Sequence, residues 1–162
     1  MSLFQQETKT FAWQPAVTKA ATASGTALRL GLHARDLIVT WNITAAERDS
    51  ADETYDLYIT TSDGVSSWDI AHFPQVLATG AKTFTAIISG YVYPQNVSTA
   101  APGVQAVTTA TLATATGQAN VIKTLGAGLV RHGPWGDRIN WELVVAGTVV
   151  TGISFSIQVL AK

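Results

Sequence analysis

Hydrophobic and polar residues alternate with a period of two in five separate segments of the chain. In residues 36–44, aliphatic or aromatic side chains occupy the odd positions and mostly polar side chains the even ones. The same alternation occurs in residues 55–60, 83–88, 139–145 and 153–159. Because successive side chains of a β-strand point to opposite faces of its sheet, this pattern predicts half-buried strands. The residue types that dominate the segments are those that suit a pleated surface.

Turn-forming residues separate these segments, and no convincing amphipathic helix lies between them. Ser62-Asp63-Gly64 follows the second segment, and Ala146-Gly147-Thr148 lies between the last two, where it predicts a hairpin. About eight short strands joined by turns are typical of an all-β, antiparallel β-sandwich or jelly roll. The last two strands are the most regular and apolar, so we expect them at the centre of the fold.

The chain divides into a short N-terminal arm and one domain. Its length of 162 residues fits a single core. We predict an extended arm over residues 1–25 and a single β-sandwich domain over residues 26–162. Two segments, 18–27 and 96–120, are rich in small polar residues and show no pattern. One interpretation is a flexible arm and a surface loop. The other is that both become ordered only against a neighbouring subunit, since small side chains lose little entropy on docking.

Composition narrows the choice of partners. Hydrophobic residues make up 47% of the chain and charged residues only 13%, against about 25% in an ordinary soluble domain. A surface with few charges to desolvate suits close contact with other proteins. The formal net charge is -1 and the basic residues are scattered, so we expect no binding to nucleic acid. With no apolar run of about 18 residues and no signal-peptide pattern, we expect no membrane partner.

The candidate chemistry is sparse. The chain has no cysteine, which excludes disulfides, zinc–thiolate sites and cysteine nucleophiles. His33, His72 and His132 lack metal-binding spacing and are interpreted as strand-end or loop residues, with a site built from distant residues as the alternative. The acidic stretch 49–56 lacks the order of a calcium loop; it is interpreted as a solvated loop, with adventitious calcium as the alternative. No helix start follows Gly126-Ala127-Gly128, as a phosphate loop requires. We therefore predict no catalytic residues, metal or cofactor.

The aromatic residues are more informative. Trp41 and Trp141 are in phase with apolar strand faces and are predicted to lie in the core. Other tryptophans have polar or turn neighbours, and each either pins a loop to the core or projects towards a partner. The candidate interface residues are Phe4, Phe11, Trp13, Trp68 and Trp135. An alternative use, as a sugar-stacking platform, would involve Trp68, Tyr91, Tyr93 and Trp135.

The C-terminal stretch 131–162, RHGPWGDRINWELVVAGTVVTGISFSIQVLAK, resembles a terminal hairpin of small structural proteins from tailed-phage virions. In those proteins a G-x-x-G-D-x-I/V turn precedes an alternating strand, a Gly-Thr turn and a last strand rich in Ser and Phe. The resemblance covers about a fifth of the chain. It implies a capsid cement or decoration protein, a class that often has a jelly-roll fold. Its partners would be the major capsid protein and further copies of itself, as a homodimer or homotrimer.

These observations lead to one main expectation and two alternatives. The main expectation is a non-enzymatic virion structural protein, made in the host cytoplasm, that binds the phage capsid lattice and stabilises it. Many weak contacts on one lattice would then act together through multivalency. The alternatives are another virion component, such as a tail, neck or fibre protein, and a carbohydrate-binding β-sandwich.

Overall fold

The computed structural model describes residues 9–30, 35–62, 64, 67–90, 121–123, 125–131 and 135–161. The described residues form strands, turns and loops and contain no helix. The strands are β1 (Lys9–Lys19), β2 (Ala23–Ser24), β3 (Leu28–Arg29), β4 (Asp36–Ala46), β5 (Thr54–Ser62), β6 (Ser67–His72), β7 (Lys82–Ser89), β8 (Val121–Ile122), β9 (Leu129–Val130), β10 (Arg138–Ala146) and β11 (Ile153–Ala161). All five predicted strands are present.

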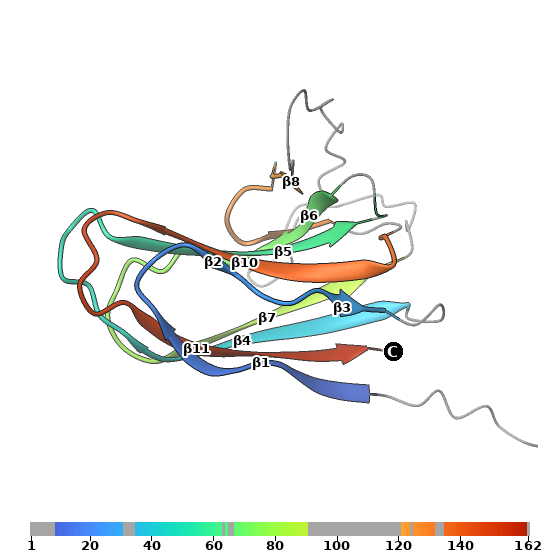
Figure 1. The fold of residues 1–162 in the computed structure, drawn as a ribbon, viewed down its shortest axis with the longest axis horizontal. Coiled ribbons are helices and arrows are strands. Elements are labelled where there is room, and N and C mark those ends of the chain that lie inside the picture. The colour runs from blue at the N-terminus through green and yellow to red at the C-terminus, as the bar shows by residue number, and fades with distance from the viewer. Residues whose placement is uncertain are drawn as a thin grey trace, which may run out of the picture.

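The strands form two sheets that pack against each other as layers (Figure 1). Sheet A has the order β1-β11-β4-β7 and is antiparallel throughout. Sheet B has the order β2-β10-β5-β6-β8, with β3 also paired to β10 and β9 to β6. Its pairs are antiparallel except for the two-residue pair of β6 and β8. The predicted antiparallel β-sandwich is confirmed, and the jelly-roll connectivity stays a prediction.

The core lies between the two layers and is filled by the apolar face of each strand. Trp41 and Trp141 are 0% and 1% exposed, so their predicted core positions are confirmed. Phe155 of sheet A meets the ring of Trp141 of sheet B edge-on, with 5.6 Å between the ring centroids. Phe155 also meets Trp41 edge-on at 6.4 Å. A run of aromatic rings thus joins the two sheets, because alternation points one face of every strand towards the opposite layer.

The predicted hairpin at residues 146–148 is wrong. β10 pairs with β5 in sheet B, whereas β11 pairs with β1 and β4 in sheet A. The connection therefore crosses from one layer to the other, and it needs backbone conformations that favour glycine at Gly147 (φ 87°) and Gly152 (φ 86°). Both strands have neighbours on two sides, as expected for central strands.

The described part of the predicted arm is paired within the chain itself. β1 runs along the whole of β11, from the pair Lys9–Ala161 to the pair Lys19–Ile153. The register shifts twice along this pairing, and β2 then pairs with β10 in sheet B. Residues 9–25 therefore contribute to both layers, and the sandwich extends across the predicted boundary at residue 25.

Candidate binding face and polar clusters

Two of the predicted interface residues, Phe11 and Trp13, lie on β1 at the edge of sheet A. A third, Phe4, lies outside the described residues. Phe11 of β1 is 38% exposed. The side chain of Trp13 is partly buried against the core, and its indole Nε1 donates a hydrogen bond to the carbonyl oxygen of Thr26 at 3.0 Å. Trp13 thus joins β1 of sheet A to the connection between β2 and β3 of sheet B.

The other predicted aromatic residues belong to sheet B or its margins. Trp68 on β6 and Trp135 before β10 are both partly buried and pack against the core. Trp135 lies directly against Gly90, where an added Cβ would be 3.0 Å from its Cζ2 atom. Tyr91 and Tyr93, which belong to the alternative sugar platform, lie outside the described residues. The structure therefore distributes the candidates over both sheets, and their role in an interface stays a prediction.

A different surface, the outer face of sheet A, has the properties expected of a binding face. Its side chains alternate with the buried ones along β4, β7 and β11. Away from the strand ends these positions hold Ile38, Thr40, Asn42, Thr83, Thr85, Ile87, Ser154, Ser156, Gln158 and Leu160. None of these side chains is charged, and Asp36 stands at the margin, where β4 begins.

Polar side chains on this face bind one another across neighbouring strands. The hydroxyl of Thr83 donates a hydrogen bond to Oδ1 of Asn42 at 2.9 Å. The hydroxyls of Thr40 and Thr85 are 3.4 Å apart and share a weaker bond. Such cross-strand pairs stiffen a sheet and fix its side chains. A partner that docks here would meet an ordered surface and would displace water from few strongly hydrated groups.

The outer face of sheet B is occupied by a segment of the chain itself. His72, at the end of β6, is buried and places Nδ1 2.9 Å from the carbonyl oxygen of Leu125 and Nε2 2.9 Å from Oδ1 of Asp56. A carbonyl oxygen only accepts hydrogen bonds, so Nδ1 is the donor to Leu125. The ring of Tyr58 stacks on His72 at 4.0 Å, and the ammonium of Lys123 lies 4.8 Å from the Tyr58 centroid.

Asp69, three residues before His72 on β6, also binds the segment that contains Leu125. Its carboxylate is fully buried. One oxygen accepts a hydrogen bond from the backbone N–H of Leu125 at 2.6 Å, and the other from the guanidinium of Arg131 at 3.2 Å. Buried charges need such partners. This cluster was not predicted from the sequence, where the available signal is two ionisable residues, Asp69 and His72, that flank the apolar pair Ile70 and Ala71. The partners explain the cluster as a structural clamp on residues 125–131.

The acidic stretch 49–56 is only partly the solvated loop that we predicted. That interpretation is wrong for Asp56, which is bound to His72, and for Glu53, which is 0% exposed. Glu53 accepts a hydrogen bond from the backbone N–H of Asp49 at 2.8 Å and a second from the hydroxyl of Tyr55. Burial of the Tyr55 hydroxyl raises its pKa above the ordinary value, and the hydrogen bond to the Glu53 carboxylate raises this pKa further. Among the described residues, no group of three acidic, His or Cys side chains is placed to hold a metal ion.

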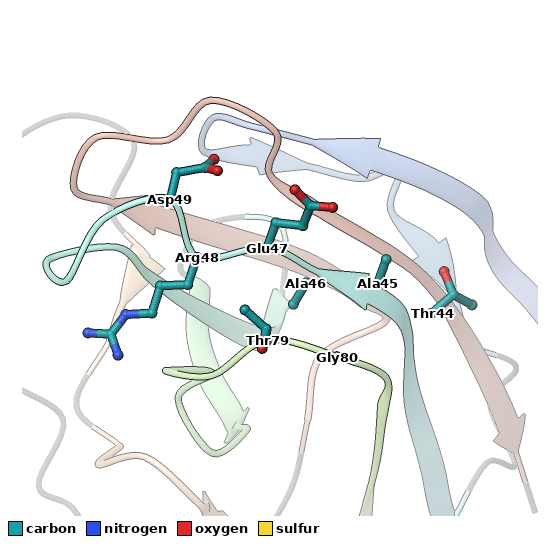
Figure 2. A pocket seen from close by; sticks show the side chains of 8 residues that line it. All are labelled: Thr44, Ala45, Ala46, Glu47, Arg48, Asp49, Thr79 and Gly80. Carbon is teal, nitrogen blue, oxygen red and sulfur yellow. The ribbon is translucent and has the colours of Figure 1, made fainter.

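A shallow hollow of about 460 Å³ lies where β4 ends, beside the loop that precedes β7 (Figure 2). It is lined by Thr44, Ala45, Ala46, Glu47, Arg48, Asp49, Thr79 and Gly80. Figure 2 shows that the guanidinium of Arg48 points away from the neighbouring carboxylates. Arg48 donates to the carbonyl of Leu77 at 2.7 Å, and the carboxylate of Asp49 accepts from the N–H groups of Val150 and Thr151 at 3.2 and 3.0 Å. These charges anchor loops and do not converge on a ligand.

The chain matches no protein-family model, no curated protein and no solved structure. In the part of the chain that the structure describes, no helix is long and apolar enough to cross a membrane. Of the sites described above, the outer face of sheet A is the one whose side chains are both ordered and turned towards solvent.

Proposed function

We propose that this chain is a non-enzymatic structural protein of a tailed-phage virion, and that it binds the capsid lattice and stabilises it. The observation that carries the proposal is the uncharged outer face of sheet A. A protein that spreads over another protein needs a broad, ordered surface with little charge to desolvate, and this face provides one. The buried ionisable groups of sheet B are engaged in structural bonds, as expected of a protein that works by packing.

The resemblance of residues 131–162 to virion proteins supplies the partner, the major capsid protein. It applies to the order of turn, strand, glycine turn and last strand in the sequence. It does not extend to a hairpin, because β10 and β11 lie in opposite sheets. The resemblance thus supports the class of assembly, while the neutral outer face of sheet A supports binding through surface contact.

The mechanism is mechanical. Each copy bridges neighbouring capsid subunits, and the lattice presents the same site many times, so weak contacts add up through multivalency. A protein that binds the assembled shell and not its separated subunits stabilises the shell by mass action. The temperature at which the capsids break open should therefore rise with the concentration of added protein.

The test uses the full chain and tailed-phage heads from which accessory proteins have been stripped. We expect the protein to sediment with the heads in saturable amounts and to raise their opening temperature in calorimetry. Heads that neither bind the protein nor gain stability would overturn the proposal. Saturable binding of a glycan by the free protein, without binding to heads, would instead support the carbohydrate-binding alternative.

A further inference from the structure

Two arginines face each other across neighbouring strands of sheet B. Arg29 of β3 is the cross-strand partner of Arg138 of β10. The next pair along these strands, Leu28 and Ile139, packs into the core, so both arginines belong to the outer face of the sheet. Like charges directly opposite each other destabilise a strand pair. In the part of the chain that the structure describes, the arginines have one carboxylate partner, Asp137, whose Oδ1 lies 3.5 Å from Nε of Arg138. Positive charge is therefore in excess at this position.

Two serines continue the row that the arginines begin. Arg138 is the partner of Ser62 of β5, and Ser62 is the partner of Ser67 of β6. A hollow of about 240 Å³ borders this row and is lined by Ala27, Thr60, Thr61, Ser62, Ser67, Arg138, Ile139 and Asn140. None of these lining residues is acidic. The clamp on residues 125–131 lies further along β6, at Asp69 and His72.

The polar side chains of the hollow have donors to spare, because their acceptors are already engaged. Oδ1 of Asn140 accepts a hydrogen bond from the backbone N–H of Trp141 at 2.9 Å. The other end of this amide is therefore the Nδ2 group, which carries two N–H donors. Oγ of Ser62 accepts from the backbone N–H of Gly64 at 3.0 Å, which leaves the hydroxyl proton to donate elsewhere. Ser67 adds a second hydroxyl.

The backbone that carries Arg138 is held on both sides. The hydroxyl of Thr61 donates to the carbonyl oxygen of Arg138 at 2.8 Å and accepts from the backbone N–H of Gly136 at 2.9 Å. On the other side, the N–H of Leu30 donates to the carbonyl oxygen of Asp137 at 2.9 Å and fixes β3 against β10. The two arginines are thus kept side by side by bonds that do not involve their guanidinium groups.

We propose that this hollow binds a small molecule through a phosphate group, with Arg29 and Arg138 as the cations. An ionised carboxylate has about four lone-pair sites, fewer than the N–H and O–H groups of two guanidinium forks, two hydroxyls and an amide. A phosphate monoester has three terminal oxygens and a charge of about −1.5 to −2 at pH 7, which balances two guanidinium groups. The planar guanidinium binds phosphate through two parallel hydrogen bonds. This site goes beyond capsid binding and does not depend on it.

NMR chemical-shift titration of the full chain tests the proposal with three probes that share a sugar ring: glucose 6-phosphate, glucuronate and glucose. We expect glucose 6-phosphate to produce saturable shifts at Ser62, Ser67 and Asn140, with a Kd of about 1 mM or tighter. Glucuronate, which carries a carboxylate, should bind at least about tenfold more weakly, because it leaves several donors without an acceptor. Glucose should not saturate the site.

Three variants then separate the fork of the guanidinium from its charge. Arg138→Gln removes both and should weaken the binding of glucose 6-phosphate at least about tenfold. Arg138→Lys keeps the charge without the fork and should give an intermediate affinity. Lys82→Gln is the matched control, because it removes one positive charge from β7 in the other sheet, and it should bind within about twofold of the parent. Should Arg138→Gln not fold, Arg29→Gln removes the other cation and should weaken binding at least about fivefold.

Several results would overturn the proposal. The parent chain would have no such site if glucose 6-phosphate gave no saturable shifts, or gave them only at residues away from the hollow. Glucuronate or glucose bound as tightly as glucose 6-phosphate would show that phosphate is not what the site recognises. Equal weakening by Lys82→Gln and Arg138→Gln would show a general effect of charge. Attachment to phage heads is measured separately, so none of these results decides the proposed function.

Discussion

Replacing Gly25 with alanine should destabilise the protein through a single, well-defined clash. Gly25 lies between β2 and β3, and its backbone N–H donates to the carbonyl of Trp141 at 3.1 Å. A Cβ added at this position would lie 1.9 Å from the indole Nε1 of Trp141, 2.3 Å from Cε2 and 2.6 Å from Cδ1. All three distances are far inside van der Waals contact, so either the ring or the backbone must move.

Neither side of this contact moves easily. The ring of Trp141 is 1% exposed and is held edge-on against Phe155, while the hydrogen bond to its carbonyl holds the glycine in place. Overpacking of a core costs about 1–3 kcal/mol, and complete expulsion of a tryptophan ring about 3–5 kcal/mol. We expect Gly25→Ala to reduce the free energy of unfolding by about 3 kcal/mol, which lowers the melting temperature by roughly 6–12 °C for a chain of this size.

Chemical denaturation and calorimetry of two variants test this reasoning. Gly126→Ala is the matched control, because the added Cβ meets only Leu129 Cδ1, at 3.4 Å, and should change stability by less than about 0.5 kcal/mol. In a Trp141→Phe background, the smaller ring should leave room for the methyl group, so Gly25→Ala should cost clearly less than in the parent. A Gly25→Ala variant as stable as the control, or a penalty unaffected by Trp141→Phe, would refute the packing that we describe.

Three further perturbations probe other parts of the fold. Tyr55→Phe removes a hydrogen bond to the buried Glu53 and should lower the free energy of unfolding by about 1–3 kcal/mol. The pKa of Tyr55 is raised above 10.0 in the folded state, so the parent should lose stability as the pH rises above about 10. Denaturation curves at increasing pH should show a smaller loss for the variant. His72→Leu leaves the Asp56 carboxylate without its imidazole partner and should increase hydrogen exchange in residues 125–131 while leaving β4 and β11 protected. Deleting residues 1–19 removes β1 from β11 and should lower the melting temperature and promote aggregation through the exposed strand edge; unchanged stability would show that β1 is not bound in solution.

The strands could be predicted because alternate burial along a strand requires alternate apolar residues in the sequence. In β4, the buried Leu37, Val39, Trp41 and Ile43 are the residues whose period of two signalled a strand. A sheet with one face in the core and the other in solvent requires this alternation. The core positions of the two tryptophans followed from the same phase.

The partner of each strand could not be predicted, because alternation shows which face is buried and not which neighbour pairs. Ala146-Gly147-Thr148 has the composition of a tight turn, yet a connection between sheets needs the same glycine conformations. The clamp of His72 and Asp69 escaped detection for a similar reason. Its other members, Leu125 and Arg131, lie more than fifty residues further along the chain, and nothing in local spacing links them.

The distribution of charge strengthens the argument for a contact surface beyond what composition indicates. At least three of the 11 acidic residues, Glu53, Asp56 and Asp69, are buried, so the already low charge content overstates the charge that faces water. Asp56 and Asp69 lie on the side of sheet B, where they hold residues 125–131 in place. The outer face of sheet A receives none of this charge. Exposed apolar surface is ordinarily a liability for solubility, and this face exposes the aliphatic side chains Ile38, Ile87 and Leu160, which the proposed contact with another protein would cover.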